Sequence, residues 1–263
     1  MPTVSSVTQG TPIWVDLQST DAAEAAAFYR ALFGWDLSEP TEQTGGYWLA
    51  SVGGVPVCAI GSLPQALAEN GAMPTWTTYL SVDDADAAAA AIPEAGGRVL
   101  LPPGEPRSGV RLLIATDATR AIVGLWQNSG AHTPWLRNEP GAVDWFELMS
   151  DDVDAAVDFY QAVLGASVSH MKLGASDYPM LNSAGGEFAG VTTPDVAGLP
   201  SHWRVYFAVT DLTESVELVK KLGGRVLSKP ASAEGVGSWA AVTDPHGAVF
   251  SLLQAESAAP DES

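Results

Sequence analysis

Hydrophobic and polar positions alternate every second residue in four segments of the chain, and each of these segments is followed by an amphipathic, often alanine-rich stretch. A period of two is typical of a strand with one buried face, and a period near 3.6 is typical of a helix. Helices are expected at Asp21–Phe33, Asp83–Ala95, Val153–Leu164 and Leu212–Leu222. Aspartates at the helix starts suit N-caps, and the glycine after each helix suits a left-handed C-terminal cap.

The pattern repeats along the chain. The segment WVDL at positions 14–17 returns as WFEL at positions 145–148, and Trp76 of the next strand returns as Trp203. The spacing between the two strands is slightly longer in the first copy, and the difference is assigned to a longer loop near Leu63–Thr75. A repeat of this length predicts duplicated modules.

A weaker repeat lies inside each half of the chain. In the first half, Asp21 before one helix matches Asp84 before the next, and Gly34 matches Gly97. In the second half, Asp152 matches the aspartate before the last helix in the same way. The chain is therefore divided into four units of the βαβββ type.

These repeats define the expected domain organisation. The first module is expected at residues 11–127 and the second at 142–254, joined by a linker at 128–141 that is rich in Pro and Gly and lacks periodicity. Residues 1–10 and 255–263 are small and polar and are expected to be flexible. The predicted fold class is α+β, made of tandem βαβββ modules. The modules are expected to pair either within one chain or between chains.

Composition limits the partners of the protein. The 263 residues include 31 acidic and 12 basic side chains, which gives a net charge of −19. Such a surface repels phosphate backbones and anionic lipids, so no nucleic acid and no membrane partner is predicted, although strong acidity also simply keeps a protein soluble. A single cysteine, Cys58, excludes an internal disulfide. The N-terminus lacks a signal-peptide pattern and no apolar run approaches the roughly 20 residues of a membrane span, so a cytoplasmic location is expected.

The helices and one turn resemble a known family, the vicinal oxygen chelate superfamily of glyoxalases, bleomycin-resistance proteins and extradiol dioxygenases. The resemblance rests on the pattern Asp-x-x-x-Ala-x-x-Phe-Tyr, closed by Gly, at residues 21–34 and 152–165, and on the turn Asp-Pro-His-Gly at 244–247. It covers nearly all of residues 11–254 and implies curved mixed sheets around a cleft, with helices outside. The tandem arrangement is similar to two-module actinobacterial members, some of which are accessory proteins of antibiotic clusters.

Members of this superfamily that carry out metal chemistry hold the ion with His, Glu or Gln from the first and closing strands of each half. The corresponding positions here hold neither His nor a carboxylate: Trp14, Thr77, Cys58, Gly124, Trp145, Arg204, Gly190 and Ser251. A lone histidine such as His202 is more often structural than a ligand, because metal sites need clusters. No metal and no other cofactor is therefore predicted. A metal-dependent lyase or dioxygenase with shifted ligands, Asp16, Glu147 and His202, is kept as a third functional alternative to the two given below.

Residues of the opposite strand parity are expected to line the cleft. They are half aromatic and half polar, whereas an ordinary solvated face would carry Lys, Glu and Thr. Apolar and aromatic walls with a few polar groups are typical of a small-molecule pocket. The expected ligand-contacting residues are Trp14, Tyr79, Trp126, Trp145, Met149, His202 and Ser251. In the alternative interpretation, these rings fill a collapsed cleft as part of the core.

Asp16 and Glu147 occupy equivalent positions among these rings. A carboxylate in such surroundings is expected to have a raised pKa, which suits a general acid or base. Tyr206, like its equivalent Tyr79, would donate a hydrogen bond to a ligand carbonyl, and Arg204 would hold a developing anion. A structural ion pair between Glu147 and Arg204 is an equal alternative.

These patterns lead to two main functional hypotheses. In the first, a metal-free protein binds a bulky aromatic or polyketide-like small molecule, in self-resistance or as an accessory or tailoring protein of secondary metabolism. In the second, a metal-independent acid/base enzyme acts on such a molecule as an isomerase, cyclase or dehydratase. Fold alone does not choose between them. The protein is expected to be a monomer or a homodimer.

Overall fold

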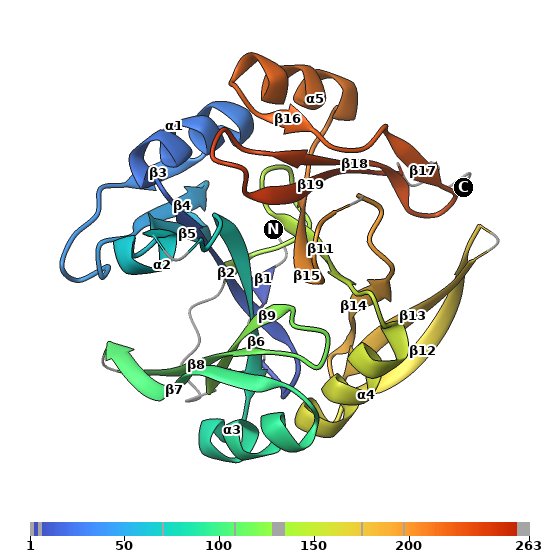
Figure 1. The fold of residues 1–263 in the computed structure, drawn as a ribbon. Coiled ribbons are helices and arrows are strands. Elements are labelled where there is room, and N and C mark those ends of the chain that lie inside the picture. The colour runs from blue at the N-terminus through green and yellow to red at the C-terminus, as the bar shows by residue number, and fades with distance from the viewer. Residues whose placement is uncertain are drawn as a thin grey trace.

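The computed structural model describes residues 3–4, 7–69, 71–107, 109–127, 135–174, 176–196 and 198–256. Two large mixed sheets, one for each module, meet through their central strands in the middle of the molecule, and the helices lie around the outside (Figure 1). The predicted α+β class with tandem βαβββ modules is confirmed. None of the helices in the described ranges is long and apolar enough to cross a membrane.

The first module contains eight strands of one sheet. They are β2 Pro12–Ser19, β3 Asp36–Ser38, β4 Trp48–Val52, β5 Val55–Ser62, β6 Thr75–Val82, β7 Arg98–Arg107, β8 Val110–Thr116 and β9 Ile122–Gln127. Their order is β3-β4-β5-β2-β6-β9-β8-β7, so the first strands of the two units, β2 and β6, pair antiparallel at the centre. Helices α1 (Ala22–Phe33) and α3 (Ala85–Glu94) follow these two strands, and the short α2 (Gln65–Glu69) lies in the loop predicted to be longer in this module.

The second module repeats this plan. Its strands are β11 Val143–Met149, β12 Ser167–Leu173, β13 Ser176–Ser183, β14 Gly186–Thr192, β15 His202–Ala208, β16 Arg225–Val226, β17 Ala231–Ala233, β18 Gly237–Thr243 and β19 Val249–Ala255. The sheet order is β12-β13-β14-β11-β15-β19-β18-β16, with β17 paired to β18. Helices α4 (Val153–Leu164) and α5 (Leu212–Lys221) follow the central strands β11 and β15.

The helices begin and end at the predicted caps. Each of the four long helices begins after an aspartate whose side chain accepts backbone N–H groups of the first turn: Asp21, Asp84, Asp152 and Asp211. Each is followed by a glycine with positive φ, which side chains with a Cβ rarely adopt: Gly34, Gly96, Gly165 and Gly223. Helix α3 begins at Ala85 rather than Asp83, because Asp84 is the capping residue.

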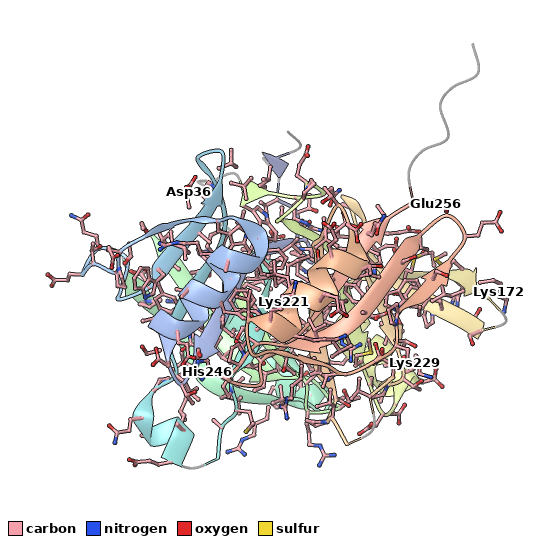
Figure 2. The ribbon with its side chains drawn as sticks, turned by 90° about the horizontal axis from the view of Figure 1, so that it is seen from above. Asp36, Lys172, Lys221, Lys229, His246 and Glu256 are labelled. Carbon is pink, nitrogen blue, oxygen red and sulfur yellow. The ribbon has the colours of Figure 1, made fainter. Side chains whose placement is uncertain are left out.

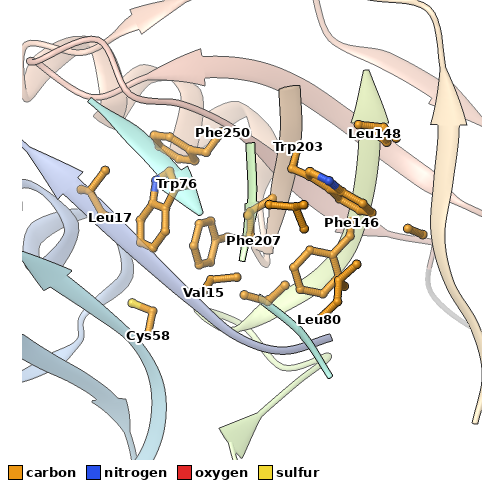
Figure 3. Packing of buried hydrophobic residues seen from close by; sticks show 14 of the residues in the cluster. Val15, Leu17, Cys58, Trp76, Leu80, Phe146, Leu148, Trp203, Phe207 and Phe250 are labelled. Atoms are coloured by element: carbon orange, nitrogen blue, oxygen red, sulfur yellow. The ribbon is translucent and has the colours of Figure 1, made fainter. Parts of the chain in front are cut away.

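The hydrophobic core joins the two modules. Val15 of β2, Phe146 and Leu148 of β11 and Phe207 of β15 are all fully buried in one continuous cluster (Figure 3). Helix α1 contacts α5, and α3 contacts α4, so each helix of one module packs beside a helix of the other (Figure 1). The modules therefore pair within the chain, which was left open by the sequence.

The motifs that carried the family resemblance meet across this interface. Tyr29 of α1 donates to Asp244 Oδ2 of the other module at 3.4 Å, and Tyr160 of α4 donates to Asp117 Oδ2 at 3.3 Å. Trp76 Nε1 donates to the Tyr29 hydroxyl at 3.0 Å, and the equivalent tryptophan of the second module makes the same contact. The Phe-Tyr pair of each helix is thus matched to the aspartate turn of the other module.

The turn after Asp244 also places His246 beside the start of α1 (Figure 2). His246 Nδ1 lies 3.3 Å from Thr20 Oγ1, and His246 Nε2 lies 3.3 Å from Glu24 Oε2. This histidine therefore belongs to the contact between the modules.

Two segments differ from the sequence-based expectation. Thr3–Val4, within the N-terminal stretch expected to be flexible, forms β1 and pairs antiparallel with β10 (Trp135–Leu136). Trp135 and Leu136 are fully buried, so the last part of the predicted linker joins the core, as the large apolar area of these side chains favours. Residues 128–134 of that linker and residues 257–263 lie outside the described ranges.

Candidate functional site

The predicted site residues lie on the face of each sheet that points away from the shared core. In antiparallel register, Trp14 pairs with Tyr79 and Asp16 pairs with Thr77, and partners in register share a face. We call this surface of module one the Asp16 face, and it consists of Trp14, Asp16, Gln18, Tyr47, Ala59, Gly61, Thr77, Tyr79, Gly124 and Trp126. The Glu147 face of module two consists of Trp145, Glu147, Met149, Tyr178, Gly190, His202, Arg204, Tyr206 and Ser251.

Asp16 is a buried carboxyl group with one unused oxygen. It is 6% exposed, and the Tyr79 hydroxyl donates to Oδ2 at 2.9 Å. Its Oδ1 makes no hydrogen bond with the residues that the structure describes. Burial raises the pKa of Asp16 to about 7, against the opposing effects of Tyr79, Gln18 and Thr77. Asp16 can therefore exchange a proton near neutral pH.

Half-buried side chains lie around Asp16 on the same face: Trp14, Gln18, Tyr47 and Trp126. The ring of Trp126 meets that of Tyr79 edge to face, with centroids 6.0 Å apart. The ring of Trp14 packs against Trp135 of β10 at 6.1 Å. The structure thus brings Tyr79 and Trp126 together next to the carboxyl group, while Trp14 is partly engaged by the segment between the modules.

Tyr47 is a site residue that the sequence analysis missed. Gln18 Nε2 donates to its hydroxyl at 2.5 Å, and burial raises its pKa. Tyr178, which donates to Glu147 in module two, was also missed by the sequence analysis. Tyr47 and Tyr178 are separated by the same offset that relates Asp16 to Glu147. The repeat itself was therefore the signal that would have found them.

Glu147 differs from Asp16 because both of its oxygens are engaged. Tyr178 donates to Oε1 at 2.7 Å, and Tyr206 donates to Oε2 through a short hydrogen bond. Trp145 Nε1 in turn donates to the Tyr178 hydroxyl at 3.1 Å. Burial raises the pKa of Glu147. In both modules the central tyrosine, Tyr79 or Tyr206, is committed to the carboxyl group, which differs from its expected contact with a ligand carbonyl.

Arg204 is fully buried, and its ion-pair partner is Asp195, at 2.7 Å between NH1 and Oδ1. No direct Glu147–Arg204 ion pair occurs among the described residues, so the structural pair considered above is replaced by one with a loop residue. His202 Nε2 lies 3.5 Å from Arg204 NH2, and burial lowers the pKa of His202. Met149 and Ser251, also predicted to contact a ligand, are fully buried.

The difference between the two carboxyl groups arises on the neighbouring parallel strand. Gly190 pairs with Glu147, and a Cβ at Gly190 would overlap the Tyr178 hydroxyl, so the tyrosine occupies that space. In module one the residue that pairs with Asp16 is Ala59. Its methyl group takes the equivalent space, and Tyr47 instead lies over Gly61, where a Cβ would be 2.6 Å from the ring. Tyr47 therefore reaches Gln18 and leaves Asp16 Oδ1 without a partner.

Replacing Gly190 with alanine tests this explanation. The new methyl group should displace Tyr178 from Glu147 and leave a buried carboxyl oxygen without a donor. A loss of about 2 kcal/mol in the free energy of unfolding is expected, measured by chemical denaturation. Gly104→Ala is the control, because its Cβ would meet nothing nearer than 3.7 Å. Equal stability of the two variants would contradict the role assigned to Gly190.

The residues on these faces do not fit a metal ion. Gly124 and Gly190 stand at two of the positions that carry a closing-strand ligand in metal-binding members. A side chain at Gly124 would overlap the Tyr79 ring, and one at Gly190 would overlap the Tyr178 hydroxyl, so tyrosines occupy the space of these ligands. The position assigned to Cys58 was wrong by one residue, because Cys58 points into the core and Ala59 shares the face of Asp16 (Figure 3). Within the described ranges, no three His, Cys, Asp or Glu side chains converge as ligands, and this includes the alternative set of Asp16, Glu147 and His202.

A hollow of about 550 Å³ lies elsewhere on the surface. It is lined by Thr8 and Gln9, the end of α4 and Asn182 and Ser183, and it contains neither carboxyl group. Asp16 and Glu147 are only 6% and 7% exposed, so a ligand that reaches them would also contact the half-buried side chains on the same faces.

Comparison with known proteins places this geometry in a family. The family model for the Glyoxalase/Bleomycin resistance protein/Dioxygenase superfamily matches residues 11–120 and 142–252. CFP32 of Mycobacterium tuberculosis, named provisionally as a glyoxylase, is 40% identical over 257 residues, which cover 97% of this chain and 98% of that protein. The anthracycline biosynthesis protein DnrV of Streptomyces peucetius is 33% identical over 257 residues, which cover 93% of each chain.

Solved structures show the same fold. The Mn(II)-bound glyoxalase from Novosphingobium aromaticivorans has a TM-score of 0.62 at 16% identity, covering 94% of this chain and 83% of that one. The 2,2',3-trihydroxybiphenyl 1,2-dioxygenase from Sphingomonas wittichii has a TM-score of 0.62 at 14% identity, covering 97% of this chain and 95% of that one. At this level of identity, the likeness extends to the fold alone.

Proposed function

We propose that this chain, which belongs to the glyoxalase/bleomycin resistance protein/dioxygenase superfamily, binds a planar, hydroxylated aromatic or polyketide-like small molecule on its Asp16 face. In this role it is an accessory protein of secondary metabolism, in self-resistance or tailoring, and it works without a metal. One observation carries the proposal. The buried Oδ1 of Asp16 lacks a hydrogen-bond partner in the described part of the chain and shares its face with half-buried Trp14 and Trp126.

The chemistry of this face supports a hydroxylated ring system. A buried acceptor without a partner costs roughly 1–3 kcal/mol, and a ligand hydroxyl that donates to Asp16 Oδ1 would recover much of that cost. Tryptophan rings offer flat surfaces on which a planar ligand can stack. Two relatives are named as anthracycline biosynthesis proteins, and anthracyclines are planar, hydroxylated aromatic molecules. The ligand class inferred from the residues and the names of these relatives agree.

A second function, proton transfer, is favoured by the pKa of Asp16. A carboxyl group with a pKa of about 7 is present in both protonation states at neutral pH and can take up or release a proton during isomerisation, cyclisation or dehydration. Glu147 is less suited to this role, because tyrosine hydroxyls engage both of its oxygens.

Calorimetric titration with 2,6-dihydroxyanthraquinone, a planar ring system whose hydroxyls are free to donate, in the presence of EDTA tests the proposal. The wild type is expected to bind, and Trp126→Ala is expected to weaken binding about tenfold, the equivalent of roughly 1.4 kcal/mol of lost stacking. Asp16→Asn should also weaken binding, because its one remaining acceptor oxygen is needed by the Tyr79 hydroxyl and an NH2 donor then stands in place of Oδ1. Trp145→Ala, on the other module, is the control and should bind like the wild type.

The recovered compound separates the two functions. An unchanged ligand supports a binding protein, whereas conversion by the wild type but not by Asp16→Asn supports proton-transfer catalysis. Equal affinity of the wild type and Trp126→Ala would overturn the assignment of this face as the binding surface.

A further inference from the structure

Arg204 of β15 is a fully buried guanidinium whose ion pair is made by a residue of an outer loop. Its Nη1 lies 2.7 Å from Asp195 Oδ1, and Asp195, in the loop between β14 and β15, has a side chain that is 38% exposed. Burying a charged group is costly unless a counter-charge and hydrogen bonds satisfy it. The Arg204 Nε makes no hydrogen bond with any described residue. The guanidinium is therefore only partly satisfied within the protein.

Neighbouring groups on the Glu147 face do not use this free donor. Each oxygen of Glu147 already accepts one hydrogen bond, from Tyr178 or from Tyr206, and neither accepts one from Arg204. Ser251 pairs with Tyr206 in parallel register, is fully buried, and has a hydroxyl without a hydrogen-bond partner in the described ranges. Two buried donors on one face, the Arg204 Nε–H and the Ser251 O–H, thus lack acceptors.

We propose that the Glu147 face binds a small molecule that carries a carboxylate, and that this carboxylate replaces Asp195 as the partner of Arg204. The planar guanidinium matches a carboxylate through two parallel N–H···O bonds. Asp195 balances the charge of Arg204 until the ligand arrives, and its exposure lets it return to water at small cost. The half-buried Trp145 ring on the same face suits an aromatic acid.

This site is independent of the one proposed on the Asp16 face. Thr77 stands in module one where Arg204 stands in module two, directly after the matched tryptophan in both cases, and it carries no charge. The first module is therefore expected to be indifferent to a carboxylate. The protein's net charge of −19 repels anions at long range, so binding is best measured near 0.15 M salt, where charges are screened beyond about 8 Å.

Benzoate and benzamide, matched in shape but not in charge, test the inference on the wild type and on Asp195→Ala. The substitution should lower the melting temperature, because it leaves the buried guanidinium without its counter-charge. Benzoate should restore that temperature and benzamide should not. Benzoate should also bind Asp195→Ala roughly tenfold more tightly than the wild type, because the internal competitor is gone. Asp195→Asn keeps a polar side chain and gives the same comparison should the alanine variant not fold.

Two further variants complete the test. Asp177→Asn makes the same charge change as Asp195→Asn at an exposed ion pair with His170 and Lys172, and it should leave benzoate binding unchanged. Arg204→Lys keeps the charge but loses the planar fork, and it should lose the preference for benzoate over benzamide. The inference is overturned if benzoate fails to restore the melting temperature of Asp195→Ala and also binds this variant no more tightly than it binds the wild type. It is equally overturned if benzamide produces both effects as strongly as benzoate. Binding of 2,6-dihydroxyanthraquinone at the Asp16 face would be unaffected by either result.

Discussion

Asp16→Asn is expected to make the protein more stable than the wild type at pH 8 and to remove part of its pH dependence. In the folded protein the pKa of Asp16 is about 7, compared with 3.8 for an unperturbed aspartate. Between these values the folded state holds a proton that the unfolded chain has released, so the free energy of unfolding falls as the pH rises through this window. Roughly three pKa units correspond to at most about 4 kcal/mol, present at low pH and lost by about pH 8.

Asparagine resembles the neutral acid and does not titrate, so the gain should grow as the pH rises from about 4 and should be complete by about pH 8. Denaturation curves at pH 5 and pH 8 measure it. Asp177→Asn is the control, because exposed His170 and Lys172 lower the pKa of Asp177, so its ionised form is the stabilising one at both pH values and its removal should bring no gain at pH 8. Parallel pH profiles for the wild type and Asp16→Asn would show that Asp16 ionises normally in the folded protein.

The fold was largely readable from the sequence because its signals are local. Aspartate caps, glycine after each helix and two-residue alternation predicted the four long helices and the central strands, and the repeat predicted the modules. The pairing of the modules depends on contacts between Tyr29 and Asp244 or Tyr160 and Asp117, which are far apart in the chain. The burial of Trp135 likewise depends on tertiary contacts, which no local sequence pattern predicts.

The candidate site was readable in part. Strand parity correctly placed Asp16 and Glu147 on faces that also carry Tyr79 and Tyr206. Parity cannot say which donor reaches which oxygen, and this is why the roles of Tyr178 and Asp195 were missed. It also depends on register, and a shift of one residue reverses every side chain in a strand. That is the origin of the wrong position given to Cys58.

The asymmetry of the two faces has a simple physical source. Ala59 in one module and Gly190 in the other decide whether a tyrosine can reach the central carboxyl group. Duplication gave two similar sheets, and the methyl group of Ala59, together with the shorter side chain of Asp16, leaves a free acceptor on one face. Hydroxyls without a partner occur on both faces, Ser81 in module one and Ser251 in module two, whereas the charged group that lacks a partner on the second face is a donor, Arg204. The two modules therefore differ in the charged group that each leaves partly unsatisfied, a carboxyl group in one and a guanidinium in the other, which is the basis for assigning them different ligands.

Asp244→Ala is expected to cause the second large effect, a loss of about 3 kcal/mol in the free energy of unfolding. Asp244 is 1% exposed, and its Oδ1 accepts the backbone N–H groups of His246 and Ala248, each at 2.9 Å. Its Oδ2 accepts the Tyr29 hydroxyl at 3.4 Å. Alanine would leave all three donors without this acceptor, at roughly 1 kcal/mol each. Urea denaturation followed by far-UV circular dichroism measures the loss.

Comparison with two other variants separates the turn from the contact between the modules. Tyr29→Phe leaves the turn intact, and because 3.4 Å is long for an O–H···O bond, its effect should stay below about 1 kcal/mol. Asp117→Ala should match Asp244→Ala, since Asp117 makes the equivalent bonds to Thr119, Ala121 and Tyr160. If the shared core makes the modules one cooperative unit, each aspartate variant unfolds in a single transition at lower urea. A separate early transition in Asp244→Ala alone would instead mean that the second module unfolds independently, against the continuous core described above.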